Sequence, residues 1–258
     1  MIRFFFIANT FLVGFTSTAQ IVNIENKRIY DDTLGWSGVI DASMSQVKND
    51  QLFFNLAFRT RVQYKTKRHY YLILLDEQFS GSSSATYSNS GMAHFRYAYR
   101  LQRKNAERKS PWKWESYAQV QYNSVLDLQF RGLIGTGLRW KFADKDLGKM
   151  FLGSSVFIEH EVIRSSADEY SDLRWSNYLS WYLNVSKKIS FTGATYIQPN
   201  TERFKDYRFM GQYALLFSVF KRLDLRAEFN GFYDSDPVPG VNNWVYSSVF
   251  GIRVKLGE

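Results

Sequence analysis

The chain has 258 residues, a formal net charge of +9 and 18% aromatic residues, and it is long enough for one large all-β domain or two small domains. It contains no cysteine, which excludes disulfides, thiolate metal sites and a lipoprotein anchor. The positive charge is moderate, and no basic helix or RNA-binding aromatic motif accompanies it, which argues against nucleic-acid binding. The mean hydropathy of −0.33 is compatible with a transmembrane β-barrel, because half the residues of such a barrel face a polar interior.

Residues 1–19 have the organisation of an export signal. Arg3 gives a short positive start, residues 4–15 form a mainly apolar core, and residues 16–19 are small, as before a cleavage site. An N-terminal anchor helix is the alternative, but the apolar run is shorter than the roughly 20 residues that a membrane span needs. We therefore expect a signal peptide over residues 1–19 and a mature domain over residues 20–258.

From residue 34 onward, apolar or aromatic residues alternate with polar ones. Successive side chains of a strand point to opposite faces, so each alternating segment predicts a strand with one apolar and one polar face. Twelve such segments are predicted: residues 34–44, 52–64, 70–77, 92–101, 112–126, 130–142, 150–162, 173–185, 189–197, 207–219, 223–233 and 243–256. The third segment is apolar on both faces for most of its length, so its own sequence does not fix its register.

The connections between these segments differ in length. Residues 185–188 and 220–222 are tight turns, whereas residues 79–91, 164–172, 198–206 and 234–242 are longer and rich in Ser, Asp, Pro and Gly. Short turns on one side and long loops on the other are typical of outer-membrane barrels, in which the short side is periplasmic. Two connections depart from this pattern, because residues 103–111 are long on the short side and residues 126–130 are short on the long side.

Periodicity alone does not show which face of the sheet points outward. A soluble, lipocalin-like barrel would turn the apolar row inward around a ligand. Trp and Tyr near the strand ends of the apolar row favour lipid outside, since membrane interfaces carry such aromatic girdles. These residues are Trp112, Trp114 and Trp140 at one rim, and Trp175, Tyr233, Trp244 and Tyr246 at the other. The prediction is an all-β fold, a twelve-stranded antiparallel transmembrane β-barrel of the outer membrane.

The polar row carries charges of both signs, which we expect to face the lumen. They are Arg59, Arg61, Arg96, Arg131, Arg139, Glu159, Glu161, Arg174, Arg208, Arg226, Glu228 and Arg253. One interpretation is a narrow path for small solutes whose cationic excess favours anions, as charged pore rings do. The interpretation that we favour is a structural barrel filled by side chains that pair to offset their desolvation.

Catalytic chemistry has little support in the sequence. Outer-membrane phospholipases use a His with a nearby Ser on the outer wall, and His160 alone falls on the predicted lipid face near the outer rim. It is followed by Glu161 and Val162 rather than by a Ser two places on. His94 is expected to face inward and His69 to lie in a turn. We expect no enzyme, cofactor or metal site; a lipid hydrolase is kept as the alternative, together with a binding protein that presents its loops, such as residues 234–242.

Two further features concern partners and family. Basic residues gather on the predicted periplasmic rim, where they would be solvated or would contact anionic lipid headgroups: Lys65, Lys67, Arg68, Arg103, Lys104, Arg108, Lys109, Lys187, Lys188, Lys221 and Arg222. Residues 206–208 (DYR), 218–225 (SVFKRLDL) and 233–241 (YDSDPVPGV), with 131–139 (RGLIGTGLR) and 184–191 (NVSKKISF) upstream, resemble the salt-induced outer-membrane protein family, a domain of unknown function. The resemblance implies an outer-membrane β-barrel and supplies no catalytic residue.

Taken together, these patterns predict an exported, non-enzymatic barrel in the bacterial outer membrane. Its expected partners are outer-membrane lipids and, if the lumen is open, small solutes. Nucleic acid is not expected, and the oligomeric state is left open.

Overall fold

The computed structural model describes residues 34–48, 52–82, 86–102, 109–220 and 223–254. These residues form strands and one short 3-10 helix, η1 (Ser124–Leu126). The strands are β1 (Gly35–Lys48), β2 (Leu52–Lys65), β3 (His69–Ser82), β4 (Thr86–Arg100), β5 (Trp112–Asn123), β6 (Leu128–Lys145), β7 (Gly148–Ile163), β8 (Glu169–Asn184), β9 (Ile189–Pro199), β10 (Tyr207–Phe220), β11 (Leu223–Asp234) and β12 (Trp244–Val254). The predicted all-β class is confirmed, whereas the predicted signal peptide lies outside the described residues.

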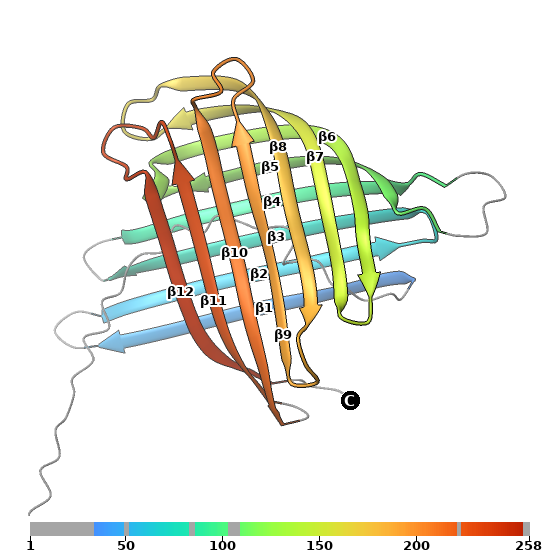
Figure 1. Cartoon of the computed structure of the whole chain (residues 1–258). Coiled ribbons are helices and arrows are strands. Elements are labelled where there is room, and N and C mark those ends of the chain that lie inside the picture. Colours follow the sequence, from blue (N-terminus) through green and yellow to red (C-terminus); the bar gives the residue numbers. More distant parts are fainter. Residues whose placement is uncertain (1–33, 49–51, 83–85, 103–108, 221–222, 255–258) are drawn as a thin grey trace, which may run out of the picture.

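All twelve strands belong to one sheet, in which each strand pairs with the strands before and after it in the sequence. Every ladder is antiparallel, from β1 with β2 through β11 with β12. The sheet curls strongly, so that β1–β4 run behind β9–β12 and at a steep angle to them (Figure 1). Among the described residues, no ladder joins β1 to β12.

The curled sheet has a polar inner face and an apolar outer face. In β7, Leu152, Val156 and Ile158 are exposed on one row, whereas Glu159 and Glu161 are buried on the other. The same alternation holds along β6 and β8, where Arg139 and Arg174 are buried. In the described part of the chain, buried polar and charged residues outnumber buried hydrophobic ones, the reverse of a soluble protein core.

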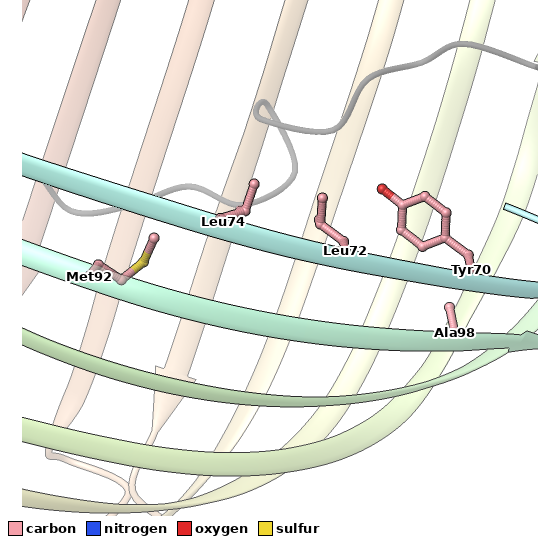
Figure 2. Close-up of a cluster of buried hydrophobic side chains, with 5 residues drawn as sticks. All are labelled: Tyr70, Leu72, Leu74, Met92 and Ala98. Carbon is pink, nitrogen blue, oxygen red and sulfur yellow. The ribbon is translucent and has the colours of Figure 1, made fainter. Parts of the chain in front are cut away.

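An apolar patch on the inner face of β3 and β4 is the exception. Tyr70, Leu72, Leu74, Met92 and Ala98 form one buried cluster (Figure 2). Tyr71, Ile73 and Leu75 of the same strand β3 point outward and are exposed. The structure therefore settles the register that the sequence of this strand leaves open.

Several predicted boundaries are wrong. β3 continues to Ser82 and β4 begins at Thr86, so residues 79–91 are not a long loop. β5 ends at Asn123, because the side chain of Asn123 accepts hydrogen bonds from the backbone N–H groups of Val125 and Leu126 and caps η1. The connections at the two ends of the sheet consequently differ in length less than predicted.

Two names are used for the ends of the sheet. The loop end carries the connections 164–168, 200–206 and 235–243, and the turn end carries the connections 66–68, 146–147 and 185–188. Across the residues that the structure describes, no helix is both long and apolar enough to cross a membrane.

Candidate functional site

The outer face carries a row of aromatic rings near the turn end. Trp36 of β1 lies 4.9 Å from Tyr64 of β2, measured between ring centroids. The row continues through Tyr71 and Tyr97 to Trp114 of β5, with centroid separations of 6.3, 5.1 and 6.4 Å. We call these five residues the aromatic belt. The belt crosses five neighbouring strands at one level and forms a continuous aromatic row on the outer face.

The other predicted rim residues also lie on the outer face. Trp112 and Trp140 stack near the turn end, with centroids 5.5 Å apart. Near the loop end, Tyr233 packs against Trp244 at 5.1 Å. The indole N–H of Trp175 donates to Ser154 Oγ at 2.8 Å, so the ring is held against the wall with its polar edge satisfied.

Buried charges meet around Glu159 on the inner face. Three guanidinium groups reach this carboxylate from three strands: Arg131 Nε on β6 at 2.7 Å, Arg174 Nε on β8 at 2.5 Å and Arg208 Nη1 on β10 at 2.8 Å. Arg208 also donates through Nη2 to Glu161 Oε2 at 3.0 Å. Charge-assisted hydrogen bonds of this kind are the strongest that side chains form, so the group connects β6, β7, β8 and β10.

Acidic residues at the loop end complete this group. Arg174 donates to both carboxylate oxygens of Asp206 at 3.0 Å and to Asp172 Oδ2 at 3.2 Å. Arg208 Nε donates to Asp234 Oδ2 at 3.0 Å. We name the whole set the Glu159 cluster, which comprises Arg131, Glu159, Glu161, Asp172, Arg174, Asp206, Arg208 and Asp234. Its five carboxylates and three guanidiniums reverse the cationic excess that the sequence predicts here.

A second, smaller set of buried charges lies nearer the turn end. Arg96 Nη1 donates to Glu115 Oε2 at 3.1 Å, and the hydroxyl of Tyr178 donates to the same oxygen at 3.2 Å. Arg139 Nη1 lies 3.6 Å from Glu115 Oε1, and its guanidinium sits 3.9 Å above the ring of Phe151. Arg96, Glu115, Arg139 and Tyr178 are called the Glu115 cluster below.

An internal cavity of about 110 Å³ touches both clusters. Arg131 of the Glu159 cluster lines it, as do Arg96 and Glu115 of the Glu115 cluster. Its other walls come from β3, from η1 and from β7 through β12. The cavity therefore lies beside charged side chains that are paired with one another.

The structure places most of the predicted inward charges together. Arg131, Glu159, Glu161, Arg174 and Arg208 meet in the Glu159 cluster, and Arg96 and Arg139 meet at Glu115. Arg61 is half-buried on β2, outside both clusters. For Arg59, Arg226, Glu228 and Arg253 the side chains lie outside what the structure describes.

Asp172, Asp206 and Asp234 are functional candidates that sequence reasoning missed. The sequence places residue 234 in a connection, yet its carboxylate is buried and pairs with Arg208, the residue directly opposite it in the β10–β11 ladder. Asp172 and Asp234 continue the inward rows of β8 and β11, but the predicted strands 173–185 and 223–233 each stop one residue short of them.

The basic rim residues divide into three groups, the first of which is Lys65 alone, half-buried at the end of β2. Lys67, Arg68, Lys109, Lys187 and Lys188 are exposed at the turn end. Arg103, Lys104, Arg108, Lys221 and Arg222 lie outside the described residues.

His160 has a serine neighbour that the sequence around it does not show. The serine comes from the next strand, since Ser171 of β8 pairs directly with His160 of β7. His160 Nδ1 lies 3.0 Å from Ser171 Oγ, and Nε2 lies 3.8 Å from Glu169 Oε2. All three side chains are on the outer face near the loop end. The arrangement resembles a nucleophile, base and acid set, although the carboxylate is beyond hydrogen-bonding distance.

Comparison with known proteins gives a family. The family model described as "Protein of unknown function, DUF481" matches residues 41–252. The chain belongs to this family. Among solved structures, the NanC porin in a rhombohedral crystal form matches this DUF481 member with a TM-score of 0.46 and 13% sequence identity, covering 84% of this chain and 100% of that chain. A search of curated proteins found no match.

The described residues of this DUF481 protein contain no cluster of His, Cys, Asp and Glu side chains suited to a metal ion. The Glu159 cluster, which holds the most acidic side chains, has its carboxylates bonded to arginine. The two clusters therefore pair charges across the interior.

Proposed function

We propose that the protein is a non-enzymatic β-barrel of the bacterial outer membrane, closed by pairing of β1 with β12. Lipid contacts its apolar face, and the paired charges of the Glu159 and Glu115 clusters fill most of its interior. In this state the barrel has a structural role and does not conduct ions. The export signal and the resemblance to salt-induced outer-membrane proteins, both drawn from the sequence, support the location.

The proposal rests on one observation: apolar side chains face outward and charged side chains are buried inside the curled sheet. Ile134, Ile158 and Val156, in the middle of β6 and β7, are 66%, 58% and 46% exposed, whereas Glu159 and Arg174 are 1% and 2% exposed. Each apolar side chain on that face would be stabilised by contact with hydrocarbon instead of water, by roughly 1.5–3 kcal/mol for full burial. Lipid is the solvent that makes this arrangement stable.

The same lipid environment favours closure of the sheet into a barrel. A sheet edge presents a row of unpaired backbone N–H and C=O groups, and each such group is several kcal/mol less stable in hydrocarbon than in water. The strong curl of the sheet (Figure 1) and its unbroken order from β1 to β12 support pairing of the two edge strands. The exposed lysines of the turn end would then face anionic lipid headgroups.

Conductance in planar bilayers tests the filled interior. We expect no steady conductance from the wild type and a clear increase from the Glu159→Ala/Arg174→Ala double variant, which removes one charge of each sign from the Glu159 cluster. The matched control is Lys141→Ala/Asp144→Ala, which removes a partly exposed ion pair of β6. A steady wild-type conductance equal to that of the double variant would show an open pore instead.

A second candidate function rests on His160 and Ser171. A lipid hydrolase at the outer wall would use Ser171 Oγ to attack an acyl ester, with His160 accepting the proton and then delivering it to the leaving alcohol. Fluorophosphonate labelling in detergent tests this role. Labelling that is lost in both Ser171→Ala and His160→Asn, but kept in the outward-facing Ser116→Ala, would support the hydrolase. Absence of labelling in the wild type leaves the non-enzymatic barrel.

A further inference from the structure

The charges that line the internal cavity balance one another. Arg96 and Arg131 contribute two positive charges, and Asp76 and Glu115 contribute two negative ones. Arg96 bonds Glu115 at 3.1 Å, and Arg131 bonds Glu159 and Glu161 outside the cavity wall. An anion in the cavity would have to compete with carboxylates already held by these guanidiniums. The cavity therefore offers no net attraction to an ion of either sign.

Neutral polar groups make up most of the remaining polar wall. Six side-chain amides line the cavity: Gln119, Gln121, Asn123, Gln198, Gln212 and Asn230. Several of these amides already bond protein groups: Gln119 bonds Gln121 and His94, Asn123 accepts the N–H groups of η1, and Gln198 donates to Ser176. Each amide has two N–H donors and a carbonyl acceptor, so the capacity that these bonds do not use can serve both the donor and the acceptor side of a hydroxyl group. A hydroxylated solute can thereby replace cavity water with little net loss of hydrogen bonding.

Aromatic rings form part of the same wall. Tyr178 and Tyr196 pack with centroids 5.2 Å apart, and Tyr117, Phe157 and Phe232 also line the cavity. Flat apolar rings beside amide groups suit the C–H faces of a polyol or sugar, because ligand sites combine aromatic surface with a few placed polar groups. About 110 Å³ is room for several water molecules, which limits the ligand to a small one.

We infer that this cavity is a binding site for a small neutral polyhydroxylated solute of about the size of glycerol. The inference rests on the proposed function, since the site exists only inside the folded barrel. It goes further by giving the interior a ligand class, and that class differs from the anions of the solute-path interpretation of the sequence.

Saturation-transfer NMR on the full chain folded in detergent micelles tests the site, with glycerol as the probe. We expect transfer to glycerol that the smaller diol ethylene glycol suppresses and that equimolar sulfate does not. Gln119→Leu removes one wall amide at nearly constant volume and should weaken glycerol binding about five- to tenfold, the loss typical of one buried hydrogen-bond partner. The control is Val120→Leu, the next residue of β5, whose side chain is 48% exposed on the outer face.

The outcomes separate the inference from the proposed function. Heat-modifiable gel migration first reports whether each variant forms the barrel, and Gln121→Leu replaces Gln119→Leu if the latter does not fold. A folded wild type that shows no glycerol transfer, or competition by sulfate instead of ethylene glycol, overturns the inference while the barrel stands. Equal weakening by Val120→Leu also overturns it. A chain that folds only without detergent overturns the proposed function itself.

Discussion

Replacing Glu159 by Gln is the most informative change to the interior. The substitution keeps the shape of the side chain but removes the one charge that Arg131, Arg174 and Arg208 share. The new amide nitrogen would place one or both of its N–H groups against guanidinium N–H groups, so that donors would face donors. Glu161 and Asp234 would still hold Arg208, so the cluster would be weakened and not abolished.

The magnitude follows from burial and geometry. Glu159 is 1% exposed, and its bonds to Arg174 and Arg208 are 2.5 and 2.8 Å long. Breaking a buried ion pair by removing one partner costs about 3–5 kcal/mol, because the remaining charges stay buried. With a urea dependence of roughly 2–3 kcal/mol per M, the unfolding midpoint should fall by roughly 1–2 M.

Urea titration in lipid vesicles, followed by tryptophan fluorescence, measures this change. Asp144→Asn is the matched control: it also removes an acid paired with a cation, but its side chain is 46% exposed, and exposed pairs contribute roughly 0–1 kcal/mol. A Glu159→Gln midpoint as close to wild type as that of the control would refute the view that the Glu159 cluster supports the fold.

Three smaller changes test other parts of the structure. Val156→Arg puts a charge at the middle of the outer face and should lower barrel stability in vesicles by about 2–4 kcal/mol, measured by the same titration; a neutral result would argue for water at that face. Gly135→Ala places a Cβ 2.6 Å from the ring of Tyr117 and should destabilise the barrel by roughly 1–3 kcal/mol through overpacking. An unchanged unfolding midpoint would show that the ring can move aside without loss of stability. Arg139→Lys keeps the charge but loses the planar stack on Phe151, so a loss of about 1 kcal/mol is expected, and an unchanged midpoint would show that charge alone matters.

The alternation of polar and apolar residues predicted the faces of most strands. In β7 the exposed row with Leu152 and Ile158 and the buried row with Glu159 and Glu161 could be read directly, because a strand has a period of two residues. In β3 both rows are apolar, since Leu72 and Leu74 point inward into the same buried cluster as Met92 (Figure 2). The sequence of β3 therefore shows no alternation of polar and apolar residues, and the end of the strand at Ser82 was missed as well.

The partners of the buried charges could not be predicted in the same way. The sequence shows which arginines point inward, because they occupy alternate positions with the other polar residues of their strands. The acid that each arginine contacts depends on the ladder register and on the curl of the sheet. Arg208 meets Asp234 through direct cross-strand pairing and Glu159 from three strands away. Ser171 was missed beside His160 for the same reason, as a cross-strand pair leaves no short-range motif in the sequence.

The central claim is that hydrocarbon contacts the apolar row while the polar row faces an enclosed interior. Because the chain has no cysteine, single spin labels can be placed at neighbouring residues of β6, Leu133→Cys beside the cavity and Ile134→Cys on the outer face. In vesicles, the label at residue 134 should be accessible to oxygen and shielded from a water-soluble nickel complex, and the label at residue 133 should be poorly accessible to oxygen. A label at residue 134 that the nickel complex relaxes more strongly than oxygen would contradict the account.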